Sequence, residues 1–431
     1  MRVSLAFGRS GLELDLPEGP VWRVLRRREE TPIADPATAL AAALDHPIGV
    51  SGLREIATGR STAAISVCDI TRPAPNALTL PPLLARLHQA GIPREGITIL
   101  IATGLHRAAT PAEVDAILGP SIAAGYRVVN HDARDLASHA ALGVTRRGTP
   151  VYIDRRFVDA DLHITLGFIE QHLMAGFSGG RKLIAPGLAA QETIKVLHSP
   201  RFMRDPAAAE GSVEENSLHA ELLDIAALAR HDFMLDVALD KQRNITGIFA
   251  GHGIQAHAAG VHFLRTMQLE TLPEPVDAVL TTGAGYPLDL TFYQTIKGVT
   301  AAQHIVKPGG KILVFGACDE GVGAPEFTAR LMRLTTYRSY LKEIETGPVE
   351  VDQWQLEKLA MAGARVETLF YIPGVSPEAA GGLAGCIFPT PAAAVEALLR
   401  GLPANATVAV IPEGPYVFAQ LGPVQTPVLA E

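Results

Sequence analysis

Short runs of β-branched and other apolar residues alternate with helical segments along this chain of 431 residues, and this alternation restricts the fold more than any other feature. AAISVCDITRP (63–73), GITILIATGLHR (96–107) and YRVVNHD (126–132) each begin as a strand. LTLPPLLARLHQAGI (78–92) has helical spacing, and TPAEVDAILG (110–119) opens with a Thr-Pro-x-Glu capping box. Strands that alternate with helices predict a parallel or mixed sheet covered by helices on both faces.

The pattern continues to the end of the chain. Residues 161–172 indicate a strand, residues 232–252 a hairpin with a polar turn, and residues 254–269 a helix. Two prolines open the segment 272–285, which then becomes a new strand. We therefore predict two α/β domains with mixed, largely parallel sheets: an N-terminal cofactor-binding domain (1–270) and a smaller C-terminal domain (271–431). We expect the active site in the cleft between them.

Composition excludes several classes of function. Hydrophobic residues make up 48% of the chain and charged residues 19%, which is typical of a globular protein. Lys and Arg total 37 against 45 Asp and Glu, and a net charge of −8 argues against binding to nucleic acid. A small anionic substrate needs only two or three local cations, so the charge does not exclude one.

Targeting signals and cysteine pairs are also missing from the sequence. No apolar run approaches the roughly 18–20 residues that span a bilayer, and the N-terminus lacks the long apolar core of a signal peptide. Cys68, Cys318 and Cys386 are isolated and odd in number, which disfavours a disulfide framework and a thiolate zinc site. We expect a cytoplasmic protein with no membrane partner.

Polar clusters follow three of the predicted strands. They are Asp69-Ile70-Thr71-Arg72, the segment Ala102–Arg107 with His106, and Gln171-His172. Ligands of α/β sheets bind beyond the C-terminal ends of the strands. Each cluster alone is more often a structural ion pair or a surface histidine. The three together favour convergence on one crevice.

A glycine-rich segment, GFSGGRK (176–182), follows the third cluster. Arg181 and Leu183 stand where a phosphate-binding loop needs Gly and Ser or Thr, so a nucleoside triphosphatase is disfavoured. Lys182 is then a point charge, a covalent attachment site or simply a solvated side chain. His198 ends the next helical segment, either as a metal ligand or as a C-terminal cap.

The ordered set of these motifs resembles the nickel-pincer lactate racemase family, and the resemblance runs through both halves of the chain. The motifs that carry it are DITRP (69–73), ATGLHR (102–107), QHLMAGFSGGRKLIAPG (171–187), His198, FYQTIKG (292–298) and DQWQ (352–355). The family uses a pyridinium mononucleotide with two thiocarboxyl groups, which holds nickel through sulfur, carbon and sulfur. The resemblance therefore implies a 2-hydroxy acid racemase or epimerase, an isomerase, that acts on lactate or a related carboxylate.

The resemblance also implies a role for each matching residue. Lys182 is implied as the lysine that tethers the nickel-pincer nucleotide, and His198 as the fourth nickel ligand. Arg181, directly before the lysine, could touch the cofactor. His106 and His172 are implied as the two acid/base histidines. The remaining implied contacts are with the cofactor for Asp69, Ile70, Thr71 and Arg72, and with the substrate for Arg72, Tyr293, Gln294, Lys297 and Trp354.

This chemistry needs a group that takes hydride, because the Cα–H of a 2-hydroxy carboxylate is too weakly acidic for a histidine. Removal of hydride gives a planar 2-keto acid, and return to the other face inverts the centre. Two histidines on opposite faces of the substrate would move the hydroxyl proton. Arg72 and Lys297 would bind the carboxylate. The family resemblance implies proteins of cofactor synthesis as partners.

Two alternatives remain from the residues alone. His106, His172 and His198 could be the ligands of a zinc-dependent hydrolase. A non-catalytic relative could bind a nucleotide or an acid as a sensor. The physiological substrate and the oligomeric state do not follow from the sequence.

Overall fold

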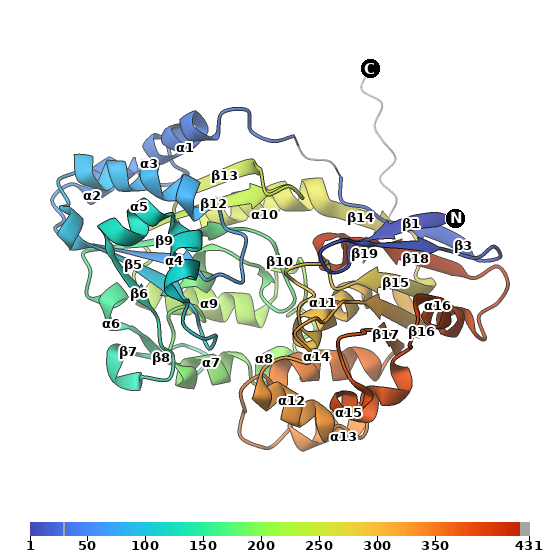
Figure 1. Cartoon of the computed structure of the whole chain (residues 1–431). Coiled ribbons are helices and arrows are strands. Elements are labelled where there is room, and N and C mark those ends of the chain that lie inside the picture. Colours follow the sequence, from blue (N-terminus) through green and yellow to red (C-terminus); the bar gives the residue numbers. More distant parts are fainter. Residues whose placement is uncertain (29–30, 423–431) are drawn as a thin grey trace. The chain divides into compact units, whose positions relative to one another are not determined.

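The computed structural model describes residues 1–28 and 31–422, which fold as two compact units (Figure 1). One unit spans residues 29–267, and the other combines residues 1–28 with residues 268–431. Each unit is built on a parallel or mostly parallel sheet with helices against it, so the predicted α/β class with mixed, largely parallel sheets is confirmed.

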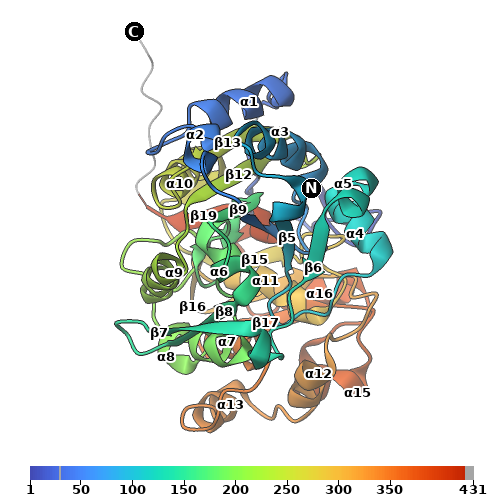
Figure 2. The same cartoon turned by 90° about the vertical axis from the view of Figure 1, so that its left-hand side faces the viewer.

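The unit of residues 29–267 contains a six-stranded sheet of order β13-β12-β9-β4-β5-β6 (Figures 1 and 2). All neighbouring pairs are parallel except β12 and β13, which form the predicted antiparallel hairpin. The strands are β4 (Ala63–Cys68), β5 (Ile97–Ala102), β6 (Arg127–Asn130), β9 (Leu162–Phe168), β12 (Phe233–Leu239) and β13 (Ile245–Gly251).

The two faces of this sheet differ in character. Leu235 and Val237 of β12 belong to the core that includes α1 (Pro36–Asp45) and α3 (Asn76–Gln89). Because side chains alternate along a strand, Asp236 between them points to the opposite face. At β4, β9 and β12 that second face carries mostly small or polar side chains. It therefore leaves room for an irregular backbone segment to lie close to the strands.

Short helices and hairpins complete this unit. The predicted capping box of α4 is present, because Glu113 N–H donates to the Thr110 hydroxyl and Thr110 N–H donates to the Glu113 carboxylate. The other elements are α2 (Leu53–Ala57), α4 (Pro111–Leu118), α5 (Pro120–Gly125), α6 (Arg155–Val158), α7 (Gln191–Leu197), α8 (Pro200–Met203), α9 (Ser217–Leu228), α10 (Gln255–Gln268), the hairpin β7 (His139–Val144) and β8 (Pro150–Asp154), the pair β10 (Gln171–His172) and β11 (Gly176–Phe177), and the 3₁₀ turn η3 (Gly180–Leu183).

The second unit has a five-stranded, all-parallel sheet of order β17-β16-β15-β18-β3. α11 and α14 pack on one face, and α16 with the β1–β2 hairpin packs on the other. The main elements are β1 (Arg2–Leu5), β2 (Leu12–Asp15), β3 (Val21–Val24), α11 (Phe292–Ala302), α14 (Gln353–Gly363), α16 (Pro391–Leu399), β15 (Val276–Thr282), β16 (Val306–Phe315), β17 (Glu367–Tyr371) and β18 (Thr407–Ile411). Around them lie α12 (Pro325–Met332), α13 (Tyr337–Glu343), α15 (Pro377–Ala380) and the parallel pair β14 (Leu269–Leu272) and β19 (Phe418–Leu421).

The predicted division of the chain into 1–270 and 271–431 needs one correction. Residues 1–28 belong to the unit formed by the C-terminal half, because β3 pairs with β18 and the β1–β2 hairpin covers the sheet. This pairing joins strands almost 400 residues apart, which local patterns in the sequence do not reveal. The other limit of the division, between residues 267 and 268, lies close to the predicted one.

No helix within the described ranges is both long enough and apolar enough to cross a membrane.

Substitution in β1 should test the structural role of the N-terminal segment. Leu5 is buried to 1% exposure, so Leu5→Ala is expected to lower the free energy of unfolding of its unit by about 2–4 kcal/mol. Both tryptophans of the chain, Trp22 and Trp354, lie in this unit, so urea unfolding followed by tryptophan fluorescence reports on it. The exposed neighbour gives the control: Ser4→Ala should change the value by less than about 0.5 kcal/mol. Equal, small effects of both substitutions would contradict the assignment.

Candidate active site

The ends of β4 and β5 bring together two of the predicted site residues. These strands are parallel neighbours, so Asp69 after β4 and His106 after β5 emerge at the same edge of the sheet. His106 Nδ1 lies 2.7 Å from Asp69 Oδ2, and the Thr71 hydroxyl donates to Asp69 Oδ1 at 2.7 Å. The Asp69 side chain is 8% exposed and that of His106 46%, so a buried carboxylate holds a ring that is open to a ligand.

The protonation of this pair follows from its surroundings. Burial acts to raise the pKa of Asp69, but the hydrogen bond and charge of His106, the charge of Arg72 and the Thr71 hydroxyl together hold it below its ordinary value. An ionised Asp69 requires the proton of neutral His106 to sit on Nδ1. The lone pair is then on Nε2, which is the arrangement of a general base oriented by a carboxylate.

His172 has the opposite arrangement. Its Nδ1 accepts hydrogen bonds from the backbone N–H groups of Met174 and Ala175 at 3.3 and 3.2 Å. A nitrogen that accepts from two amides carries no proton, so neutral His172 carries its proton on Nε2. The two histidines therefore differ at Nε2: His106 offers a lone pair there and His172 an N–H.

Arg72 joins the third strand end to the first. Its Nε lies 3.8 Å from the carboxylate of Glu170, which follows β9, and its guanidinium also donates to the Thr71 carbonyl. Ile70 in the same cluster is 38% exposed. The three polar clusters thus lie at one edge of the sheet, as predicted. Glu170 was not among the predicted residues, although it stands directly before the third cluster.

The glycine-rich segment places Lys182 close to these strand ends. Asp236 accepts a hydrogen bond from Gly180 N–H at 2.7 Å, and a Cβ on Gly179 would lie 2.2 Å from the same carboxylate. Gly179 has a φ of 80°, so glycine is required there for space and for conformation. Beyond the lysine, the Gly187 carbonyl accepts from Gly104 N–H in the His106 loop. The segment is therefore held at both ends.

His198 lies near Lys182. It ends α7, and its Nδ1 donates to the Ile194 carbonyl at 2.8 Å. Burial lowers the pKa of His198 to about 4, and the positive charge of Lys182 lowers it as well. The ring is therefore neutral at pH 7 with its lone pair on Nε2, which is the form that ligates a metal ion. The predicted roles as helix cap and as metal ligand are compatible.

The remaining predicted residues belong to the other unit. Trp354 Nε1 donates to the Tyr293 hydroxyl at 3.1 Å, so two residues 61 positions apart meet. Gln294 and Lys297 lie on α11 with Tyr293. Among the described residues, the Gln294 carboxamide oxygen is buried without a hydrogen-bond partner, which suits it to a ligand.

The zinc hydrolase alternative has no support from geometry. Within residues 1–28 and 31–422, no three His, Cys, Asp or Glu side chains are grouped so that they could hold a metal ion. A zinc site with three protein ligands would require such a group.

Comparison with known proteins identifies the family. Residues 7–211 match the family model of the lactate racemase N-terminal domain, and residues 272–418 match that of the lactate racemase C-terminal domain. The chain belongs to the lactate racemase family. It is 34% identical over 366 residues to the lactate racemase of Thermoanaerobacterium thermosaccharolyticum, covering 83% of this chain and 85% of that protein. It is 35% identical over 339 residues to that of Lactiplantibacillus plantarum, covering 78% of this chain and 79% of that protein.

Solved structures agree with this membership. The chain superposes on the lactate racemase apoprotein of T. thermosaccharolyticum with a TM-score of 0.90 and 30% identity, covering 97% of this chain and all of that one. A protein from Thermotoga maritima matches with a TM-score of 0.67 and 17% identity over 91% of this chain and all of that one, which shows a shared fold. The predicted family and its isomerase class are confirmed.

Asp236 and Arg181 both hold the backbone of the glycine-rich segment, which the sequence patterns do not indicate. Asp236 received no role, although a lone carboxylate in the apolar strand FMLDVAL was a visible signal. Arg181 was placed where it could touch a cofactor. Its side chain is instead fully buried, and it donates to the loop carbonyls and to His219.

The lowered pKa of His198 predicts a pH dependence of stability. Between pH 6.5 and about 4 the unfolded chain binds a proton at His198 that the folded chain does not. The contribution of neutral His198 to the free energy of unfolding is therefore complete above pH 6.5 and is lost as the pH falls towards 4. His198→Asn should reduce the slope of unfolding free energy against pH in this window by up to about 1.4 kcal/mol per pH unit. Urea unfolding followed by circular dichroism from pH 4.5 to 8 measures it. Parallel curves for both proteins would contradict the prediction, and above pH 7 the two slopes should agree.

Proposed function

We propose that this protein racemises lactate or a closely related 2-hydroxy acid by means of a nickel-pincer nucleotide tethered to Lys182. Membership of the lactate racemase family supports the reaction class. The observation that carries the proposal is the placement of Asp69 and His106, at 2.7 Å, on the same sheet edge as the segment that bears Lys182. The proposed base, His106, and the proposed attachment point, Lys182, would then serve the same active site.

The donor set suits the proposed cofactor. Lys182 offers an amine for covalent attachment, and neutral His198 beside it offers a nitrogen ligand for nickel. When bound, the nucleotide supplies a group that accepts hydride from C2 of the substrate and returns it. Asp69, Ile70, Thr71 and Arg72 are proposed to contact the cofactor.

The residues of the chain then handle the proton and the carboxylate. His106 is set to take the substrate hydroxyl proton at Nε2, and Asp69 stabilises the imidazolium that results. His172 is set to donate a hydrogen bond from Nε2 to an oxygen of the substrate and keeps its proton, so the imidazolium of His106 is the group that returns the proton. Arg72 binds the carboxylate, and the adjacent Glu170 limits how its guanidinium turns.

Four further residues are proposed to act on the substrate. Lys297 binds the substrate carboxylate, Gln294 hydrogen-bonds the substrate, and Tyr293 with Trp354 shields the keto intermediate from water. Proteins of cofactor synthesis are proposed as partners, because the chain itself must receive the completed nucleotide.

The test combines mass spectrometry with a chiral assay. The full chain, produced together with a nickel-pincer synthesis pathway, should carry an adduct on Lys182 and should convert one enantiomer of lactate, or of another 2-hydroxy acid in a panel, to an equal mixture. Lys182→Arg should lose both the adduct and the activity. An unmodified Lys182 in protein from that pathway, with no racemisation of any acid tested, would overturn the proposal.

Substitutions at Asp69 and at its hydrogen-bond partner Thr71 should lower kcat to different degrees. Asp69→Asn removes the charge that holds the proton on His106 Nδ1, so kcat should fall roughly 10²–10⁴-fold, the range seen when a carboxylate orients a catalytic histidine. Thr71→Val removes one neutral hydrogen bond to Asp69, so its loss should stay below about tenfold.

Both variants should retain the melting temperature of the parent, and kcat is expressed per Lys182 adduct because Asp69 and Thr71 are also proposed to contact the cofactor. Equal losses of kcat in the two variants, with the adduct intact, would contradict the role given to the carboxylate.

A further inference from the structure

Arg181 is a fully buried arginine directly before the lysine that the proposed function assigns to the cofactor. Its guanidinium donates to backbone carbonyl oxygens of the glycine-rich loop at 3.0–3.3 Å, those of Ala175, Phe177, Ser178 and Gly179. Its remaining contacts are with His219 Nδ1, at 3.1 Å from Nε, and with His257 Nε2. An arginine has five N–H donors, and these contacts engage all three of its nitrogens.

The charge of Arg181 is balanced by dipoles and by one carboxylate at a distance. Burial lowers the pKa of Arg181 to about 9, while Asp236 acts to raise it, so the guanidinium stays charged at pH 7. Asp236 in turn accepts from Gly180 N–H. The backbone before Lys182 is therefore held from two sides, with a cation on its carbonyls and a carboxylate on its amide.

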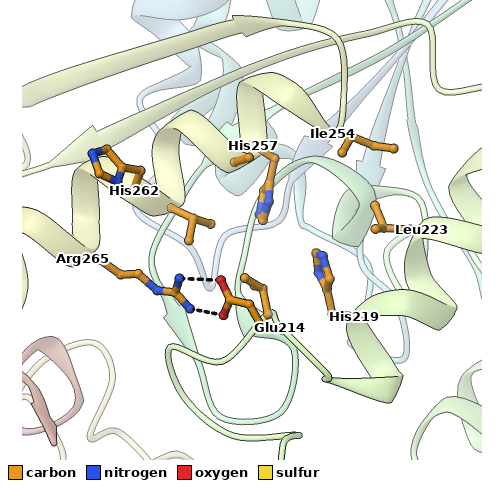
Figure 3. A pocket seen from close by; sticks show the side chains of 10 residues that line it. Glu214, His219, Leu223, Ile254, His257, His262 and Arg265 are labelled. Carbon is orange, nitrogen blue, oxygen red and sulfur yellow. Dashed lines mark hydrogen bonds and ion pairs between the residues drawn. The ribbon is translucent and has the colours of Figure 1, made fainter. Parts of the chain in front are cut away.

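The two histidines meet the guanidinium differently. His219 Nδ1 accepts a hydrogen bond from Arg181, whereas His257 Nε2 donates to the Ser178 carbonyl at 2.9 Å and only contacts the guanidinium. Burial lowers the pKa of His219 to about 3 and that of His257 well below its ordinary value, and the charge of Arg181 lowers both. Their rings stack at 6.0 Å and line a pocket of about 290 Å³ between α9 and α10 (Figure 3). Glu214 and Arg265 pair at its rim. Because His219 borders this pocket, a substitution there has room to be accommodated without displacing its neighbours.

We propose that Arg181 is a positioning residue that fixes the glycine-rich loop so that Lys182 is presented beside His198 for attachment of the cofactor. The proposal rests on the proposed function for the identity of the cofactor, and on the hydrogen bonds above for the positioning. A loop with three glycines in five residues has many conformations, and without a clamp the attachment reaction would bear the cost of ordering it.

Only a guanidinium can make this set of hydrogen bonds to the loop. A lysine at position 181 would keep the charge but could not reach four carbonyls and the His219 ring, because its ammonium is a single point with three donors. His219 of α9 accepts from Arg181, and His257 of α10 donates to the Ser178 carbonyl, so both helices help to hold the loop. The positioning of Lys182 thus depends on residues that follow Arg181 by 38 and 76 positions.

A matched pair at His219 tests the proposal with little risk to folding. His219→Asn keeps an acceptor near the place of Nδ1, whereas His219→Leu removes the acceptor and leaves a side chain of similar size beside the pocket. In the cofactor-free chain, an amine-selective reagent should label Lys182 about threefold or more faster in His219→Leu than in the parent. Lys195 on α7 is the internal reference and should label equally in all proteins. His219→Asn should resemble the parent.

Hydrogen exchange and cofactor loading give the second readout. In His219→Leu and in Arg181→Lys, amide exchange should speed up in the peptide that covers residues 175–183, and the fraction of Lys182 that carries the adduct should fall by about half or more. Melting temperatures are measured alongside, so that only variants that fold like the parent are compared.

Unchanged labelling, exchange and adduct fraction in a folded His219→Leu would overturn the positioning role. A loss confined to melting temperature would show a purely structural one and would overturn it equally. If the parent itself takes up no adduct, the proposed function fails, while the labelling of Lys182 in the cofactor-free chain still decides the role of Arg181.

Discussion

The position of Lys182 depends on how closely the glycine-rich segment packs on the six-stranded sheet. This packing is possible because the segment and the strands beneath it have small side chains at their contacts. A Cβ on Gly187 would lie 2.9 Å from Ala102 Cβ at the end of β5, and one on Gly167 of β9 would lie 2.9 Å from Leu183. The Ser66 hydroxyl of β4 donates to the Leu183 carbonyl at 2.7 Å. Three neighbouring strands therefore each hold the segment around Lys182, and a larger side chain at any of these contacts would move the lysine away from the strand ends.

This packing also determines the electrostatics. The segment brings backbone dipoles into a place that water does not reach, and buried polar groups must then be paired within the protein. Burial raises the pKa of Asp236 to about 7, against the opposing effects of Gly180 N–H and Arg181. Burial likewise keeps His198, near Lys182, neutral. The rigidity of the loop and the protonation of its neighbours thus have one physical cause.

The strands, the polar clusters at their ends and the family could be predicted from the sequence, because each depends on a local pattern or on the order of motifs. Asp69 and His106 were expected at one sheet edge, and parallel pairing of β4 with β5 brings them together. Arg181 and the pairing of β3 with β18 were not foreseen. A buried arginine and a solvated one look alike in sequence, and its partners His219 and His257 lie far along the chain.

The opposite hydrogen bonding of His106 and His172 has a consequence for the proposed reaction. Two enantiomers have equal free energies in solution, so their equilibrium constant is one whatever the enzyme does, and kcat/KM must be equal in the two directions. A histidine with a lone pair at Nε2 and a histidine with an N–H at Nε2 bind the hydroxyl group of their respective enantiomers with different strengths. Such a difference in binding can change KM and kcat only together and in proportion. The asymmetry of the site is therefore expected in the individual constants for the two enantiomers and is absent from their ratios.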